Sequence, residues 1–308
     1  MPDPVAIMRC KGDNDYSESL KQGLELIGGI HSGGLPVLVK PNLCVSKPSS
    51  SDAVTSPKLV KAVVDYVLEV DAGSSISIVE SDSDNKWVDE AYRNFGYVDM
   101  VDDYRAAGRD VKLVNLSREP AVEISTSFLS KPLRLPKMLL EPNRYFFISV
   151  AKAKTHPLTD ITGILKNQFG CIPRKDKLVY HRSLDKVIVE VNHHVTPGLC
   201  VIDAVTVMEG VIRGRLKNIG VLILGGDAAS ADAALARVMG MDPEKIVHLA
   251  LASGAGLGSL HPSLVGVPVD DVAVHVRGQN YFVRGAERML RFLVTGRSGI
   301  STTASGET

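Results

Sequence analysis

Short, continuously apolar segments recur along this chain, and most are followed by segments whose apolar residues repeat with the period of a helix. The apolar segments are rich in Val, Ile and Leu and do not alternate with polar residues. That pattern is typical of strands covered on both faces, as in a parallel sheet flanked by helices. These predicted strands lie at residues 5–9, 36–40, 75–79, 111–115, 145–150, 198–203, 219–224 and 271–276.

Helices are expected between the strands, at residues 16–27, 57–68, 87–94, 184–192, 229–239 and 243–253. Two of them carry terminal signals: Ser56 before Pro57 is an N-cap and N1 pair, and Gly240 ends the helix that closes at Met239. The alternation predicts the α/β class, with a mostly parallel, Rossmann-like sheet flanked by helices.

Residues 1–294 are expected to form a single α/β domain, since a chain of 308 residues can bury a large core without disulfides or metals. Residues 295–308 are rich in Gly, Ser and Thr, so a flexible tail is predicted there. Residues 131–142 break both periodicities and mark a candidate boundary between two α/β halves.

The charges are balanced, with 35 Lys plus Arg against 35 Asp plus Glu, so no overall field attracts nucleic acid or a membrane surface. No apolar stretch is long enough to cross a bilayer, and a cytoplasmic protein is expected. The cysteines (Cys10, Cys44, Cys171 and Cys200) form no metal-binding ladder, so an intrinsic iron-sulfur cluster is not expected.

Polar residues follow the predicted strand 36–40. Lys40 ends this strand, and Asn42 lies two residues later. In open α/β sheets ligands bind outside the carboxyl ends of strands, so both are candidate ligand-binding residues. The alternative is that Lys40 only extends to water.

Cations concentrate between Phe146 and Arg182, a segment that contains seven lysines and arginines but only two carboxylates. Such a local positive region suits a phosphate or carboxylate, so a small anionic molecule is the expected partner. The aromatics of the basic part are Phe169 and Tyr180, too few to favour nucleic acid. A solvated loop is the alternative for the residues around Lys175. The cations are Lys152, Lys154, Lys166, Arg174, Lys175, Lys177 and Arg182.

Three residues of this segment are candidate catalytic groups. His156 can serve as general base, metal ligand or hydrogen-bond donor, and Lys154 shares its loop. Lys166 follows a glycine and two apolar residues, which would desolvate its amine for nucleophilic or proton-transfer chemistry.

Carboxylates follow the next two predicted strands. Asp203 ends the strand 198–203 and Glu209 lies six residues on, so they are candidates to bind a metal, orient a lysine or transfer protons. For Asp203, capping of the next turn is the equal alternative. Asp227 is interpreted as a helix N-cap, with Asp232 favoured by the same helix dipole.

These residues, in order, resemble the domain-of-unknown-function family 362. The match runs over roughly residues 35–260, and its most specific part extends from Lys154-Thr155-His156 to Lys166-Asn167. The resemblance adds Asn167 and Lys177 to the candidate cofactor- or ligand-binding residues Lys40 and Asn42. Many members of that family carry iron-sulfur cysteine ladders that this chain lacks, and the family label names no reaction.

The order His156, Lys166, His181 is also similar to that in the nickel-pincer lactate racemase family. This similarity implies a divalent metal ion as a candidate cofactor, with His181 as metal ligand, His156 as proton-transfer residue or ligand, and Lys166 as the anchoring or catalytic amine. The Gly-rich link of that family is replaced here by residues 159–165.

The sequence therefore predicts an enzyme, of isomerase, lyase or oxidoreductase type, acting on a small anionic substrate. Lysines and Asn42 would bind it, the histidines would transfer protons or hold a metal, and Asp203 and Glu209 would balance charge. The alternative is a non-catalytic ligand- or metallocofactor-binding protein that serves a redox partner. A homo-oligomer is also compatible with the sequence.

Overall fold

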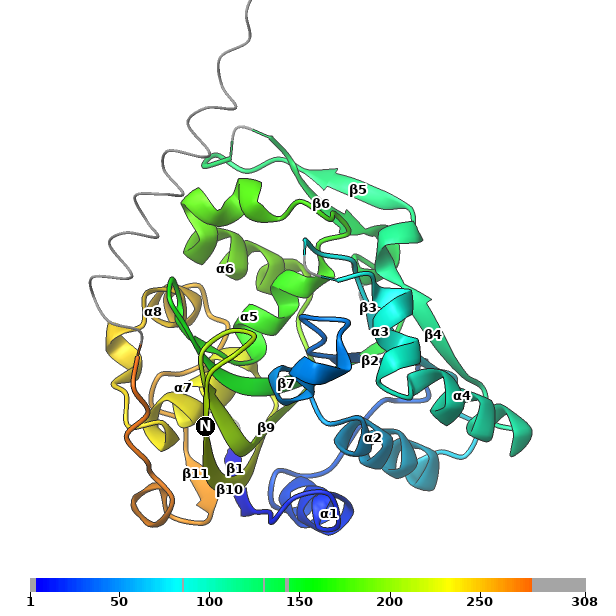
Figure 1. The fold of residues 1–308 in the computed structure, drawn as a ribbon, viewed down its shortest axis with the longest axis horizontal. Coiled ribbons are helices and arrows are strands. Elements are labelled where there is room, and N and C mark those ends of the chain that lie inside the picture. The colour runs from blue at the N-terminus through cyan, green and yellow to red at the C-terminus, as the bar shows by residue number, and fades with distance from the viewer. Residues whose placement is uncertain (1–3, 85, 130, 142–143, 279–308) are drawn as a thin grey trace, which may run out of the picture.

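The computed structural model describes residues 4–84, 86–129, 131–141 and 144–278. The predicted class is confirmed: a nine-stranded, mostly parallel sheet is flanked by helices (Figure 1). The strand order is β11-β1-β10-β9-β7-β2-β3-β4, and β8 pairs with β7 beside this path. The strands are β1 (Val5–Arg9), β2 (Val37–Pro41), β3 (Ile76–Glu80), β4 (Val111–Asn115), β7 (Phe146–His156), β8 (Asp160–Thr162), β9 (Leu199–Glu209), β10 (Arg215–Gly225) and β11 (Leu264–Gly266).

The direction of the chain through the sheet changes between β2 and β7. From β2 the chain proceeds outward through β3 to β4, all parallel, whereas from β7 it proceeds the other way to β9. Of the described strands of this sheet, β10 and β8 run against the rest. The adjacent carboxyl ends of β2 and β7 therefore form a topological switch point, where open α/β sheets bind ligands.

Helices cover both faces of the sheet, each over its own hydrophobic cluster (Figure 1). One face packs against α1 (Tyr16–Leu26), α2 (Pro57–Val70), α3 (Val88–Asn94) and α4 (Tyr97–Ala106). The other packs against α5 (Ile164–Gln168), α6 (Leu184–His194), α7 (Ala228–Val238) and α8 (Val247–Gly254).

Three helix ends test the predicted signals. The Asp227 side chain accepts a hydrogen bond from the Ser230 backbone N–H at 2.7 Å, so the predicted N-cap of α7 is confirmed. Gly240 has a left-handed φ of +70°, as expected of a helix terminator. Ser56 does precede α2 with Pro57 at its first turn, but its side chain makes no capping hydrogen bond.

The predicted strands are found, with one exception. Residues 271–276 pair with no strand: the backbone N–H groups of Val274 and Val276 donate to carbonyls at the end of α7, at Val238 and Met239. The strand beside β1 is instead β11. Helix α4 was not predicted, because its buried face consists of Tyr97, Val101 and Tyr104 among charged residues.

Of the candidate boundary 131–142, the structure describes residues 131–141. They contain β6 (Leu133–Pro136), which pairs with β5 (Ala121–Ile124) in a separate two-stranded sheet. Leu133 and Leu135 of β6 join the same hydrophobic cluster as α5 to α8. The predicted tail 295–308 lies outside the described residues. No described helix combines the length and apolarity needed to cross a bilayer.

Candidate functional site

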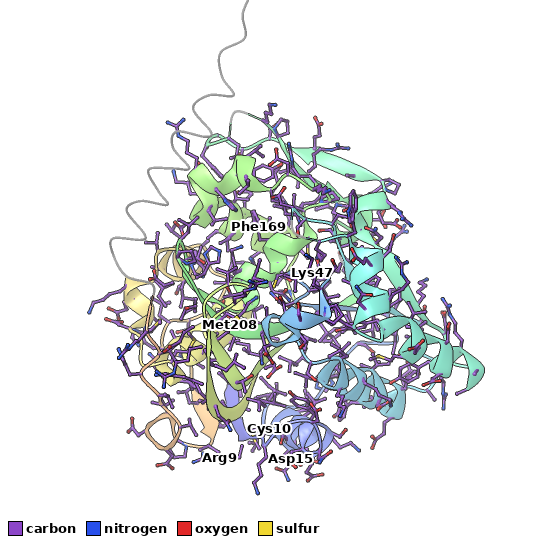
Figure 2. The ribbon with its side chains drawn as sticks, viewed as in Figure 1. Arg9, Cys10, Asp15, Lys47, Phe169 and Met208 are labelled. Atoms are coloured by element: carbon purple, nitrogen blue, oxygen red, sulfur yellow. The ribbon has the colours of Figure 1, made fainter. Side chains whose placement is uncertain are left out.

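A pocket of about 550 Å³ opens at the switch point, at the carboxyl ends of β2, β3 and β7. It contains many of the residues predicted from the sequence, brought together from distant parts of the chain. Figure 2 marks Lys47, in the loop after β2, and Phe169, just past α5, on two of the segments around it. The pocket is lined by Lys40, Asn42, Leu43, Cys44, Glu80, Ser83, Asp84, Lys86, His156, Pro157, Lys166, Asn167, Phe169, Gly170, Lys177, Leu178, His181, Val211, Ile212 and Arg213.

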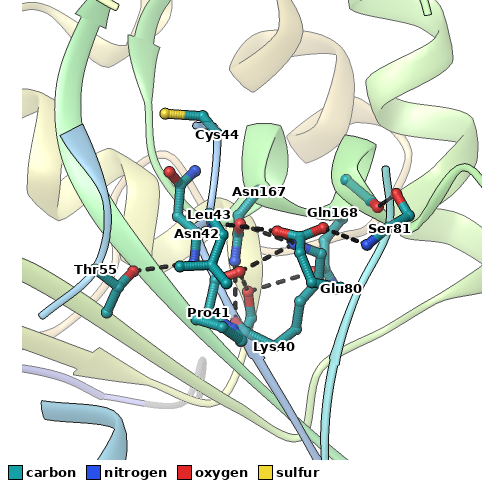
Figure 3. A network of polar contacts seen from close by, with 12 residues as sticks. Lys40, Pro41, Asn42, Leu43, Cys44, Thr55, Glu80, Ser81, Asn167 and Gln168 are labelled. Carbon is teal, nitrogen blue, oxygen red and sulfur yellow. Dashed lines mark hydrogen bonds and ion pairs between the residues drawn. The ribbon is translucent and has the colours of Figure 1, made fainter. Parts of the chain in front are cut away.

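Glu80 is the buried carboxylate of the pocket. Its oxygens accept from the Lys40 ammonium at 3.0 Å and from the backbone N–H groups of Leu43 and Ser81 (Figure 3). The Lys86 ammonium lies 3.4 Å from the same carboxylate. Burial alone would raise the pKa of Glu80, but the nearby lysine ammonium groups outweigh it and lower that pKa. Glu80 therefore stays ionised in the interior.

Three buried lysines surround this one carboxylate. Lys177 is the third, and its Nζ donates to the Ser81 hydroxyl at 2.7 Å. Burial, reinforced by the charges of Lys86 and Lys40, lowers the pKa of Lys177 to about 7. Burial also lowers the pKa of Lys86, opposed by Glu80. The site thus holds more buried amines than one carboxylate can neutralise.

Asn167 connects α5 to β2. Its Oδ1 accepts from the Lys40 ammonium at 3.1 Å, and its Nδ2 donates to the Lys40 carbonyl at 3.3 Å and the Ser149 hydroxyl at 3.0 Å (Figure 3). Two predicted ligand-binding residues, 127 positions apart, are therefore in direct contact. The amide fixes the Lys40 ammonium at the pocket wall.

The position of α5 is set by a carboxylate from another helix. Asp232, fully buried in α7, accepts the backbone N–H groups of Ile164 at 2.6 Å and Leu165 at 3.0 Å. A Cβ at Gly163 would lie 2.1 Å from an Asp232 oxygen, so the glycine is required for this approach. Burial raises the pKa of Asp232 to about 7. Asp232 thus caps α5 rather than its own helix.

Lys166, His156 and His181 all line the pocket. The Lys166 Nζ lies 4.5 Å from the centre of the Phe169 ring, which is a cation–π contact. The His156 Nδ1 accepts the Leu158 backbone N–H at 3.2 Å, which leaves the proton of a neutral imidazole on Nε2. His156 is therefore set up as a hydrogen-bond donor.

Lys154 lies behind the pocket wall instead of in its lining. It points to the sheet face opposite Lys40, and its ammonium donates to the Ala53 carbonyl at 2.8 Å, to Asn42 Oδ1 at 3.3 Å and to Cys44 Sγ at 3.2 Å. Lys154 is 1% exposed, so its stem and charge are enclosed.

Asp203 and Glu209 are not among the described residues that line the pocket. Asp203 is buried and pairs with Lys152 at 3.1 Å. Glu209, at the end of β9, lies 3.4 Å from the ammonium of Lys217 and accepts the Arg277 backbone N–H. Both carboxylates are thus engaged by other partners.

Metal binding by His156 and His181 stays a prediction. Within the described residues, no group of three or more His, Cys, Asp or Glu side chains is arranged to hold a metal ion. The lining offers amines, amides, imidazoles, one thiol, a guanidinium, a hydroxyl and the carboxylates of Glu80 and Asp84.

Glu80 and Lys86 are the central residues that the sequence reasoning missed. A usable signal was present, because Glu80 directly follows the predicted strand 75–79, as Asn42 follows shortly after 36–40. Applied to every strand, the carboxyl-end rule would have found Glu80. Lys86 lies in the loop after it and has no such signal.

Comparison with known proteins shows that the chain matches a protein family. A family model described as a domain of unknown function (DUF362) matches residues 37–237, which contain all residues of the pocket lining. A thylakoid-associated protein of Synechocystis sp. is 28% identical over 251 residues, 78% of this chain and 74% of that protein.

A crystal structure of a protein from Thermotoga maritima aligns with 79% of this chain at 14% identity and a TM-score of 0.43. The aligned chain spans 59% of that protein's length.

Proposed function

The chain belongs to the family described as domain of unknown function DUF362, and from this premise we propose an enzyme that transfers protons on a small anionic substrate. The substrate carries a carboxylate or phosphate group, which the pocket lysines bind. The predicted cytoplasmic location, redox partner and homo-oligomer stay predictions and play no part in the proposal.

The excess of buried amines is the observation that carries the proposal. Lys40, Lys86 and Lys177 are each less than 7% exposed and share the single buried carboxylate of Glu80. Buried charges are costly unless they are paired and hydrogen-bonded. An anionic group in the pocket supplies the missing partner, and Lys166 and Arg213 add positive charge to the same lining.

The rest of the lining indicates what the substrate carries besides its anionic group. Leu43, Phe169 and Ile212 are apolar, so they suit a hydrocarbon portion of the ligand. A cavity of about 550 Å³ accommodates a small metabolite-sized molecule and excludes a folded macromolecule. Contacts of its anionic group with the amines and of its hydrocarbon portion with the apolar side chains orient such a molecule.

Lys177 and His156 are the proposed proton-transfer pair. A general base works best when its pKa is near the operating pH, and the pKa of Lys177 is lowered to about 7. The fraction of Lys177 that stays a neutral amine in the complex accepts a proton from the carbon beside the substrate's carboxylate, and His156 Nε2–H then returns a proton to that carbon. Lys40 and Lys166 hold the anionic group during this exchange.

Binding of a small anion is expected to take up protons at pH 8. In the free protein Lys177, with a pKa of about 7, is mostly neutral at that pH; a bound anion favours its charged form and raises that pKa. Calorimetric titration with phosphate and with oxalate, in buffers of different ionisation enthalpy, measures this uptake. Lys177→Met should abolish the uptake and weaken binding about tenfold, the loss expected for one charge-assisted hydrogen bond.

Lys175→Met is the matched control, because Lys175 is an exposed lysine two residues away that stacks on Trp87. It should bind and take up protons like the wild type. Equal binding by the Lys177 and Lys175 variants, or no anion binding by the wild type, would contradict the proposal.

Catalysis is tested separately by hydrogen exchange at carbon. A panel of small carboxylates and phosphate monoesters is incubated with the protein in D₂O, and NMR follows loss of the C–H signal beside the anionic group. We expect exchange with at least one compound, lowered at least 100-fold in Lys177→Met and in His156→Asn, as for lost general acid–base groups. Tight binding without exchange would identify a non-catalytic binding protein instead.

A further inference from the structure

Lys154 is a buried cation that the proposed proton transfer does not use. Its ammonium has three neighbours that accept hydrogen bonds: the Ala53 carbonyl, Asn42 Oδ1 and Cys44 Sγ. Within the described part of the chain, no carboxylate forms an ion pair with it, whereas the buried Lys40 and Lys152 are paired with Glu80 and Asp203. The acidic group nearest to this ammonium is the thiol of Cys44.

Cys44 is placed between Lys154 and the pocket. It follows Asn42 and Leu43 at the end of β2, lines the pocket and is partly exposed (Figure 3). Lys154 does not line the pocket, so its charge acts on a ligand through Cys44 and Asn42. The other cysteines (Cys10, Cys171 and Cys200) are at most 1% exposed.

The sulfur of Cys44 has one cationic neighbour and one carbonyl neighbour. The Sγ accepts from the Lys154 ammonium at 3.2 Å, and as a thiol it donates to the Ala53 carbonyl at 3.3 Å. Two other charged groups lie near this sulfur. One is Lys86, which interacts electrostatically with Cys44. The other is Glu80, which accepts the Leu43 N–H and is paired with Lys40. Cations therefore dominate the surroundings of this sulfur, as at reactive cysteines.

We propose that Cys44 is a covalent nucleophile of the pocket, held as a thiolate by Lys154 and directed at anionic electrophiles. The thiol proton passes to water, and Lys154 remains protonated. A sulfur lone pair then forms a bond to an electrophilic carbon of the bound molecule, while the leaving group departs with its bonding electron pair. The preference for anionic electrophiles rests on the proposed function, whereas the nucleophilicity of Cys44 does not.

Alkylation by iodoacetamide at pH 6.5 and pH 8.5 tests the thiolate. An ordinary thiol is half ionised at pH 8.5, and its rate falls about fiftyfold at pH 6.5. We expect the Cys44 rate to fall less than tenfold in the wild type and about fiftyfold in Lys154→Met, with Lys154→Arg closer to the wild type. A wild-type fall of tenfold or more would overturn the proposal, even if a variant fails to fold.

Mass spectrometry and Cys44→Ser locate the label, since the serine variant should lose the fast reaction. Iodoacetate is the anionic probe, and it should react faster than iodoacetamide because the pocket lysines attract it. If the alkylation rate of Cys44 falls less than tenfold but iodoacetate is not preferred, only the proposed anion binding by the pocket is contradicted. If iodoacetate is preferred but the rate falls as for an ordinary thiol, only the proposed nucleophilic role of Cys44 is contradicted.

Discussion

Glu80→Gln is expected to lower the free energy of unfolding by about 3–5 kcal/mol, the loss typical when one partner of a buried ion pair is removed. Glutamine keeps the shape of the side chain but leaves the Lys40 and Lys86 amines without a carboxylate. Both amines are nearly inaccessible to water, so solvent does not replace the lost charge. Chemical denaturation at pH 7 measures the loss.

The pH dependence gives this prediction a second signature. A lysine whose pKa is lower in the folded than in the unfolded protein binds fewer protons when folded, so stability rises with pH between the two values. For Lys177 that interval runs from about 7 to its ordinary value of 10.5. Lys177 follows this course in the wild type too, so Lys86 is the group that distinguishes the variant. Glu80 opposes the lowering of the Lys86 pKa, so without Glu80 that pKa falls further and the variant should recover part of its loss as the pH rises toward 10.

Two further variants control the measurement. Asp84→Asn removes an exposed carboxylate of the same pocket and should change stability by less than about 0.5 kcal/mol. Lys40→Met in the Glu80→Gln background removes one of the unpaired amines and should restore part of the lost stability. A Glu80→Gln loss no larger than that of Asp84→Asn would show that Glu80 does not neutralise the buried lysines.

Strand ends account for what the sequence could predict of the site. Lys40 and Asn42 were predicted because each is at or just past the carboxyl end of a strand, and both line the pocket together with His156. Lys166 was found by its approach through glycine and apolar residues, whereas Asn167 was added by the family resemblance. Strand ends and the residues preceding Lys166 are signals that depend only on neighbours in the sequence, so tertiary packing does not alter them.

Strand lengths account for one misplacement. The strand predicted at 198–203 extends to Glu209, and the one predicted at 145–150 extends to His156. Asp203 is therefore in the middle of β9, where it pairs in register with Lys152 of β7. Apolar composition marks where a strand begins, but pairing with a neighbour decides where it ends, and pairing is not visible in one sequence.

The role of Asp232 was beyond local reasoning for a different reason. From the sequence it belongs to the first turns of α7, where a carboxylate is favoured by the dipole of that helix. In the fold it caps α5, whose N-terminus is 67 and 68 residues away in the chain. Only the packing of α7 against α5 creates this contact, and it connects a residue outside the pocket to the lysine and amide inside it.

Gly163→Ala is expected to damage both the fold and the pocket. The new Cβ would lie 2.1 Å from an Asp232 oxygen and 2.6 Å from its Cγ, far inside contact distance. Asp232 is fully buried, so it cannot move away without losing its hydrogen bonds to Ile164 and Leu165. Overpacking of about 1–3 kcal/mol and a lost cap of about 1 kcal/mol together predict a loss of about 2–4 kcal/mol.

The same substitution should weaken anion binding, because α5 carries Lys166 and Asn167 into the pocket and a small shift misplaces both. Calorimetric titration with phosphate should show a loss of at least tenfold in affinity, measured at a temperature where the variant is folded. Gly254→Ala is the control, since a Cβ at that helical glycine meets nothing within 4 Å and should leave stability and binding intact. The double variant Gly163→Ala/Asp232→Ala relieves the clash but still lacks the cap. Its free energy of unfolding should therefore be partly restored, while its affinity for phosphate stays low. Full recovery of affinity in that double variant would mean that Asp232 does not position α5 for binding.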